Sequence, residues 1–279
     1  MAGALPSATR MGEVHLGVAD LARSLDWYRG AIGLGVQGEH DGATRLGAGG
    51  EDLLVLRERP GSAPADGYAG LFHFALLVPE RRDLAAWLVH AARDRVPLTG
   101  LSDHWVSEAI YLRDPDHHGI EIYADRPRSF WEGRVAEGMT TEPLDTNDLV
   151  GTLEAEPESF TGLPAGTVMG HVHLRVSEVP ATVDFYRDAL GFDLQAMFGP
   201  QAAFLSAGGY HHHVGANTWE SGGAAFAPEG TARLERMTIV VPDEAALDEV
   251  EARIGGERVA AGLSVRDPSG NPVVVTVAP

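Results

Sequence analysis

No cysteine occurs in the 279 residues, which excludes disulfide bridges, thiolate zinc sites and a thiol nucleophile. Lysine is absent too, so all 21 basic residues are arginines, and 40 acidic residues leave a formal net charge of −19. This charge repels nucleic-acid phosphates and anionic lipids, so we expect neither as a partner. No apolar run approaches the roughly 18 residues of a membrane span, and Met1–Arg10 lacks a signal peptide's apolar core. We therefore expect a cytoplasmic protein.

Histidine, in contrast, occurs 12 times. It is the commonest ligand of redox-active metals and the usual acid–base residue near neutral pH. The positions of the histidines along the chain are therefore the most informative guide to function.

An internal repeat organises these positions. The stretch Val14–Val36 (VHLGVADLARSLDWYRGAIGLGV) returns at Val172–Leu194 as VHLRVSEVPATVDFYRDALGFDL, an offset of 158 residues. A fainter pair is LFHFALLVP at Leu71–Pro79 and LERMTIVVP at Leu234–Pro242. Each copy begins as an alternating apolar strand and continues into an amphipathic helix, followed by short strands bounded by glycine. The chain therefore contains four βαβββ units, at about 11–58, 70–125, 169–220 and 233–278.

The helix of the first unit is expected over Ala22–Ile32, where Leu25, Tyr28 and Ile32 share one face. Gly33 and its repeat Gly191 follow where a helix end requires a left-handed residue. Between units two and three lies a connection rich in proline, glycine and acidic residues. Its apolar residues Phe130 and Trp131 predict that it packs in part.

Four tandem units carrying DLARSLDWYRGAIG, DPDHHGIEIYAD and GGYHHHVGANTW resemble the vicinal oxygen chelate superfamily, which includes glyoxalases, antibiotic-resistance proteins and extradiol dioxygenases. The strings SEAIYLRDPDHHGIEIYADRPRSFW and MGHVHLRVSEV are most similar to the catechol 2,3-dioxygenase branch. The resemblance implies an α+β protein with two half-barrel domains. We expect units one and two in residues 1–126, a connection over 127–168, and units three and four in residues 169–279.

The resemblance also implies that metal ligands come from the first and last strands of each unit. The aligned first-strand positions hold Glu13, His73, His171 and Arg236, and the last-strand positions hold Leu54, Glu121, His213 and Val274. Units two and three thus carry three histidines and a glutamate. Two histidines with one carboxylate are typical of non-haem Fe(II) oxygenases. We predict that His73, Glu121 and His171 bind Fe(II), with Mn(II) as an alternative.

This ligand set requires unit two to pair with unit three, and unit one with unit four. Sequential pairing, as in the common two-domain dioxygenases, would instead make a cup from Glu13, His73 and Glu121. The two arrangements have different consequences for Arg236. Only the crossed pairing places Glu13 opposite Arg236, as an ion pair where a metal would otherwise lie.

Three further residues are predicted to be catalytic. His211–His213 alternate faces if they form a strand, and the repeat favours His213 facing the metal, with His212 as the alternative if the strand bulges. The resemblance implies that this histidine handles protons. It also implies that Tyr111 hydrogen-bonds a substrate oxygen and that His104 lies over the pocket, while Trp105 and Trp219 suit a flat ring.

These features predict an Fe(II)-dependent extradiol dioxygenase that cleaves catechol, or a substituted catechol, with O₂. Its partners would be a small aromatic diol and O₂, and the resemblance favours a homo-oligomer. Two alternatives share the fold: a glyoxalase-like lyase or isomerase with Ni²⁺ or Zn²⁺, and a non-catalytic protein that sequesters a ligand.

Overall fold

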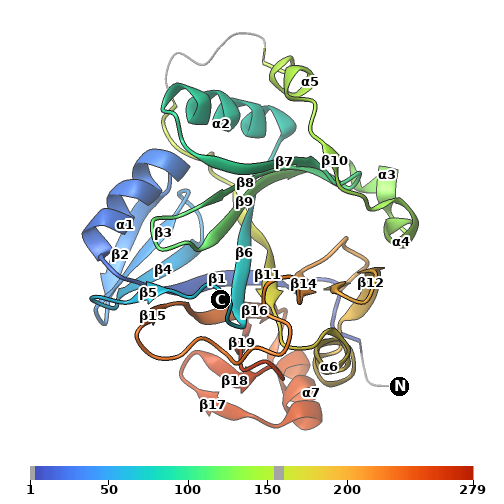
Figure 1. The fold of residues 1–279 in the computed structure, drawn as a ribbon. Helices are drawn as coiled ribbons and strands as arrows, with labels where there is room; N and C mark the ends of the chain where they lie inside the picture. The colour runs from blue at the N-terminus through green and yellow to red at the C-terminus, as the bar shows by residue number, and fades with distance from the viewer. Residues whose placement is uncertain (1–3, 154–159, 279) are drawn as a thin grey trace.

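The computed structural model describes residues 4–153 and 160–278, whose strands form two large mixed sheets (Figure 1). In each sheet, two four-stranded units meet through their first strands at the centre. Within a unit, the first strand pairs in parallel with the last, and the other two strands follow outward. The predicted α+β class with four βαβββ units is therefore confirmed.

The eight-stranded sheet contains units one and four. Its strands are β1 (Arg10–Val18), β2 (Gly35–His40), β3 (Ala43–Gly47), β4 (Asp52–Glu58), β16 (Leu234–Val241), β17 (Glu257–Val259), β18 (Gly262–Arg266) and β19 (Pro272–Val277). The nine-stranded sheet contains units two and three with one added edge strand. Its strands are β6 (Gly70–Leu77), β7 (Leu98–Asp103), β8 (Ser107–Arg113), β9 (Gly119–Asp125), β10 (Glu142–Pro143), β11 (Val168–Arg175), β12 (Asp193–Phe198), β13 (Ala202–Ser206) and β14 (Val214–Asn217).

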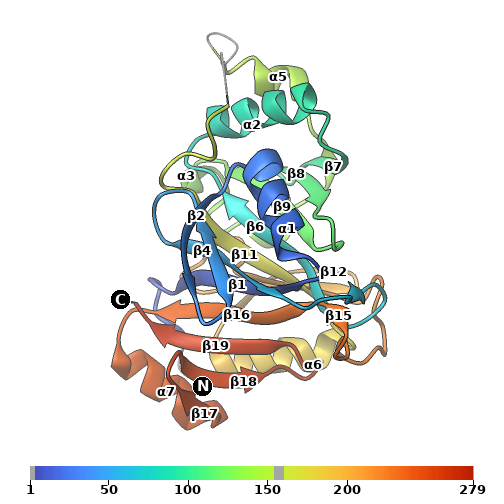
Figure 2. The same cartoon turned by 90° about the vertical axis from the view of Figure 1, so that its left-hand side faces the viewer.

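The helices and a small two-stranded sheet complete the fold, as the turned view in Figure 2 shows. The units contribute α1 (Leu21–Trp27) with the π-helix η1 (Tyr28–Ile32), α2 (Arg81–Arg93), α6 (Val179–Asp184) with the π-helix η2 (Phe185–Leu190), and α7 (Glu244–Ile254). The connection contributes α3 (Arg128–Trp131), α4 (Val135–Gly138) and α5 (Thr146–Val150), and β5 (Ala63–Pro64) pairs with β15 (Thr231–Ala232). Within the described parts of the chain, no helix combines the length and apolar character needed to cross a membrane.

The sheets confirm the crossed pairing of the units. β1 runs antiparallel to β16, and β6 runs antiparallel to β11. The sequential alternative is wrong, because the first strands of units one and two lie in different sheets. The division into 1–126, 127–168 and 169–279 describes the order of units along the chain and stays a prediction, since each sheet combines strands from both sides of the connection.

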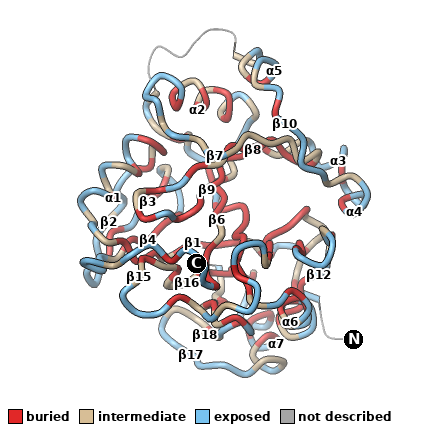
Figure 3. Tube along the Cα trace, viewed as in Figure 1, coloured by how far each residue is buried: buried red, intermediate tan, exposed pale blue. Residues whose placement is uncertain are grey.

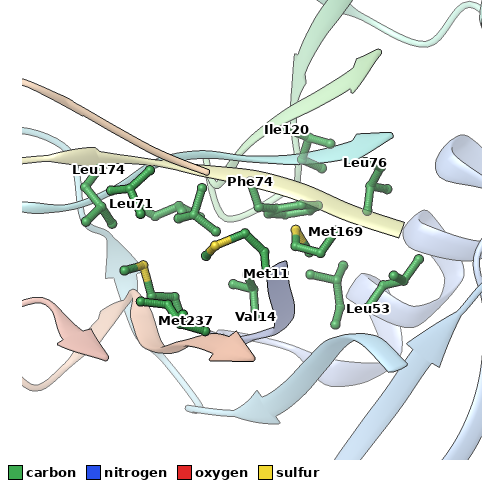
Figure 4. Packing of buried hydrophobic residues seen from close by; sticks show 14 of the residues in the cluster. Met11, Val14, Leu53, Leu71, Phe74, Leu76, Ile120, Met169, Leu174 and Met237 are labelled. Atoms are coloured by element: carbon green, nitrogen blue, oxygen red, sulfur yellow. The ribbon is translucent and has the colours of Figure 1, made fainter. Parts of the chain in front are cut away.

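The main core lies between the two sheets. Met11 and Val14 of β1 lie close to Phe74, Ile120 and other apolar residues of the nine-stranded sheet (Figure 4). Buried residues gather along the central strands, and exposed residues on the outer helices and turns (Figure 3). Because side chains alternate along a strand, the face of β6 and β9 opposite to Phe74 and Ile120 is free to carry polar groups.

The helix of unit one ends as expected, but its last turn is wider than an α-helix. Gly33 N donates to Tyr28 O, five residues back, and Gly33 adopts a left-handed φ of 88°. Unit three repeats this geometry, with Gly191 N donating to Tyr186 O and a φ of 96° at Gly191. Glycine suits both positions because it has no Cβ to clash in this conformation.

The wide turns hold two buried tyrosines against the next unit. Tyr28 of unit one donates to Asp114 Oδ2 of unit two at 2.8 Å, and Tyr186 of unit three donates to Asp267 Oδ2 of unit four at 3.5 Å. His118 lies 2.9 Å from Asp114 Oδ2, and although burial opposes it, the charge of His118 lowers the pKa of Asp114. Burial raises the pKa of Asp267, whose corresponding partner is the neutral Asn271. The first link therefore joins a hydroxyl to an ionised carboxylate.

We expect Tyr28→Phe to lower the free energy of unfolding by about 1.5–3 kcal/mol, because it removes a short bond to a buried charged acceptor. The matched Tyr186→Phe should cost about 1 kcal/mol or less, because its bond is longer and its carboxyl ionises less readily. Urea unfolding at pH 7 measures both. Equal losses would show that the charge on Asp114 contributes nothing to this link.

Candidate metal centre and cavity

Three neighbouring strands at the middle of the nine-stranded sheet carry the predicted ligands. β9, β6 and β11 lie in this order and provide Glu121, His73 and His171. Ala75 of β6 is opposite Glu121 on one side and opposite His171 on the other. Because alanine has only a methyl group, the longer side chains on both sides of it can lean toward each other.

The three side chains converge on one point. Glu121 Oε2 lies 3.0 Å from His73 Nε2 and 3.1 Å from His171 Nε2, and the two nitrogens are 3.3 Å apart. All three residues are buried, with Glu121 only 2% exposed. They are the one group of at least three potential metal ligands that the described residues bring together. The sequence prediction thus selected three residues that meet in space.

The local charges suit a cation. Burial alone would raise the pKa of Glu121, but the adjacent His171 and His73 lower it well below its ordinary value. Burial lowers the pKa of His171 to about 4 against the opposing effect of Glu121, so this imidazole is neutral at pH 7 and has a free lone pair. A carboxylate and imidazole lone pairs this close repel each other unless a proton or a metal ion lies among them. The donor set therefore fits a divalent transition metal.

In the equivalent cup of the eight-stranded sheet, an arginine of the chain already balances the charge of the glutamate. Arg236 Nη2 donates to Glu13 Oε1 at 2.8 Å, and His15 Nε2 lies 3.3 Å from the same oxygen. The ion pair expected from crossed pairing is thus present. The guanidinium supplies the positive charge there.

A cavity of about 530 Å³ opens over two of the three candidate ligands. His73 and Glu121 lie on its wall with mainly apolar neighbours, which include Phe72, Leu112, Met139, Phe198, Phe204 and Trp219. Phe72 reaches the cavity because it is an extra residue in β6, between the pairs His73–His173 and Leu71–Leu174. The expected position of Trp219 is confirmed. Trp105 instead packs against Phe130 and Gly138 outside the cavity wall.

His104 and Tyr111 both line the cavity and are bonded to each other. The Tyr111 hydroxyl lies 2.6 Å from His104 Nε2, and His104 Nδ1 lies 2.8 Å from the carbonyl oxygen of Thr140. Nδ1 must donate to that carbonyl, so in a neutral His104 the other nitrogen, Nε2, accepts from Tyr111. Burial, followed by the charge of Glu121, raises the pKa of Tyr111 well above its ordinary value, which keeps its hydroxyl protonated.

The structure places His212, and not His213, on the cavity wall. His213 Nδ1 accepts a hydrogen bond from Ala207 N at 3.1 Å, and its ring packs against Tyr210 and Phe192. The alternation argument failed because β14 begins only at Val214. The preceding residues form a turn in which Gly208 and Gly209 adopt positive φ. The Gly-Gly pair was the signal in the sequence for this turn.

His212 lies directly beside the candidate ligands. Its ring centroid is 4.0 Å from that of His171. His173 lies on the same wall, and its Nε2 accepts from Asn217 Nδ2 at 3.0 Å. Burial, reinforced by the surrounding imidazoles, lowers the pKa of both residues well below its ordinary value. The cavity therefore presents neutral imidazoles near the triad. Asn217 was not identified from the sequence, since a lone asparagine at the end of a strand carries no specific signal.

Comparisons with known proteins agree with this architecture. The profile of the family described as "Glyoxalase/Bleomycin resistance protein/Dioxygenase superfamily" matches residues 10–122 and 168–275. The catechol-2,3-dioxygenase of Bacillus subtilis (strain 168) is 42% identical over 253 residues, which cover 88% of this chain and 87% of that protein. The solved structure of a protein from Bacillus subtilis subsp. subtilis str. 168 has a TM-score of 0.66 at 14% identity and covers 100% of this chain and 87% of its own.

Glyoxalase I from Zea mays shares the fold as well, with a TM-score of 0.58 at 19% identity over 96% of this chain and 92% of its own. Both structures are too distant in sequence to indicate more than the fold. The profile match spans most of the chain, and the curated relative extends over nearly the same length. The chain belongs to the glyoxalase/bleomycin resistance protein/dioxygenase superfamily.

Proposed function

We propose that this protein is an extradiol dioxygenase that uses Fe(II) and O₂ to open the ring of a catechol beside its two hydroxyl groups. The observation that carries the proposal is the convergence of Glu121 Oε2 with the Nε2 atoms of His73 and His171 at an apolar cavity. The activity of the relative that is 42% identical supports the same reaction class.

His73, Glu121 and His171 would hold the metal on one face and leave its other positions open. When bound, iron would supply positive charge and a common site for both substrate oxygens and O₂. Mn(II) accepts nearly the same ligands and is the alternative ion. The carboxylate of Glu121 offsets one metal charge, so a catecholate can balance the remainder.

The protein's own residues would orient the substrate and control its protons. The apolar wall formed by Phe72, Phe204 and Trp219 suits a flat aromatic ring and excludes water from it. Tyr111, kept protonated, can direct a hydrogen bond to a substrate oxygen when it leaves His104. His212, on the cavity wall beside His171, is the group we assign to proton transfer, in place of His213.

The metal assignment predicts unequal effects of two substitutions at equivalent positions of the repeat. His171→Ala should lower iron affinity by more than the roughly 10–100-fold that loss of an outer partner costs, because it removes a direct ligand. Glu13→Gln, at the matching position of the other cup, should leave iron content near that of the unaltered protein. Metal analysis of protein prepared without oxygen measures both. Full iron content in His171→Ala would contradict the proposed ligand set.

The reaction predicts coupled consumption of O₂ and catechol. Protein loaded with Fe(II) and supplied with catechol in aerated buffer should take up about one O₂ per ring-cleaved product, because both oxygen atoms enter the product. An oxygen electrode and the yellow colour of the product report the two quantities. The protein without added metal is the control. Tight metal binding with no O₂ uptake would replace this proposal by a glyoxalase-like lyase, and no metal binding would replace it by a ligand-sequestering protein.

A further inference from the structure

A line of hydrogen bonds leads from the cavity wall toward the surface. His212 Nδ1 lies 2.8 Å from His211 Nδ1, and His211 Nε2 lies 2.9 Å from Asp125 Oδ1. Tyr210 donates to the other oxygen of Asp125 at 2.9 Å. His211 is fully buried, whereas the Asp125 side chain is 23% exposed. Neither Asp125 nor His211 lines the cavity.

The chemistry of these groups determines the direction of each bond. An ionised carboxylate can only accept, so His211 Nε2 must carry a hydrogen. When His211 is neutral it has only this one hydrogen, so its Nδ1 is an acceptor and His212 Nδ1 donates to it. His212 Nε2 is then left without a hydrogen. Free histidine prefers the opposite tautomer, with the hydrogen on Nε2, so the line of bonds reverses an intrinsic preference.

We propose that Asp125 and His211 are positioning residues that hold His212 Nε2 as a hydrogen-bond acceptor for a hydroxyl group bound in the cavity. Under the proposed function, on which this substrate assignment rests, the donor is one O–H of the catechol. The arrangement selects ligands that donate at this point, and an ether oxygen in place of that hydroxyl would leave His212 Nε2 unpaired.

His173 provides an internal comparison. Trp219 N donates to Asn217 Oδ1 at 3.1 Å, which orients the amide so that its nitrogen donates to His173 Nε2. The tautomer of His173 is thus determined by Asn217, independently of Asp125. A substitution of Asp125 should therefore alter the tautomers of His211 and His212 and leave the tautomer of His173 unchanged.

Nitrogen-15 NMR of the full chain tests the proposal directly, because protonated and unprotonated imidazole nitrogens have distinct chemical shifts. Spectra are recorded at about pH 8, where ordinary imidazoles are neutral, without added metal and again with diamagnetic Zn(II). We expect hydrogen on His212 Nδ1 and on His211 Nε2, and none on His212 Nε2. A hydrogen on His212 Nε2 in the unaltered protein would overturn the proposal. This measurement uses only the unaltered protein, so its outcome does not depend on whether a variant folds.

Two variants test the role of the carboxylate. Asp125→Ala should shift His212 toward the tautomer with hydrogen on Nε2, lower kcat about 10–100-fold and keep KM within about threefold, because its effect is on proton handling. Tyr210→Phe removes a bond to the same carboxylate but keeps the ring, and should preserve both the tautomer and kcat. An unchanged His212 tautomer in folded Asp125→Ala would refute the role of Asp125. If the tautomers are as expected but no O₂ is consumed, the proposed reaction fails and the positioning role stands.

Discussion

The antiparallel contact between β6 and β11 is the constraint on which the site depends. It places the first strand of unit two beside the first strand of unit three, with β9 on the far side of β6. His73, Glu121 and His171 are separated by 48 and 50 residues along the chain, yet this pairing brings them onto one face of three adjacent strands. The opposite face of the same strands carries Phe74 and Ile120 into the core between the sheets (Figure 4). Packing therefore holds the register that aligns the ligands.

The two cups of this repeated fold differ in how the charge of their glutamate is balanced. Each contains a buried or half-buried glutamate beside a histidine, and an unpaired carboxylate is costly away from water. In the eight-stranded sheet, Arg236 supplies the balancing charge to Glu13 from within the chain. In the nine-stranded sheet, the ion-pairing partners of Glu121 are the imidazoles of His73 and His171, and burial lowers the pKa of His171 to about 4. A cation from solution is the natural counterpart of Arg236 there.

The sequence predicted the part of the site that the repeat encodes. The offset of 158 residues aligned the strand positions, and the pattern of ligand types at those positions selected both the triad and the crossed pairing of units. The prediction of His213 failed at a turn, where the two positive φ values at Gly208 and Gly209 shift the residues that follow. The contact of Asp125 with His211 spans 86 residues and has no counterpart among the described residues of the other units, so no periodicity indicated it.

The connection between the halves forms part of the cavity, which explains why it is too apolar for a free linker. Met139 and Thr141 lie on the cavity wall, and the carbonyl oxygen of Thr140 holds His104 Nδ1. The connection is anchored by Trp131, which is 1% exposed and donates from its indole to Arg126 O. On the other side, Trp105 adopts a φ of 67°, a conformation that bulky residues rarely hold without support from their surroundings.

Its support is specific. Asp103 Oδ1 accepts from Trp105 N at 2.8 Å, and Arg126 pairs with both oxygens of Asp103 at 2.7 and 2.8 Å. The Trp105 ring lies against Gly138, where any side chain would collide with it. The strained residue thus fits between β7 and α4, next to His104. The carbonyl oxygen of Thr140 accepts from His104 Nδ1, which leaves His104 Nε2 to accept from Tyr111. The connection therefore determines how the outer wall of the cavity presents its polar groups.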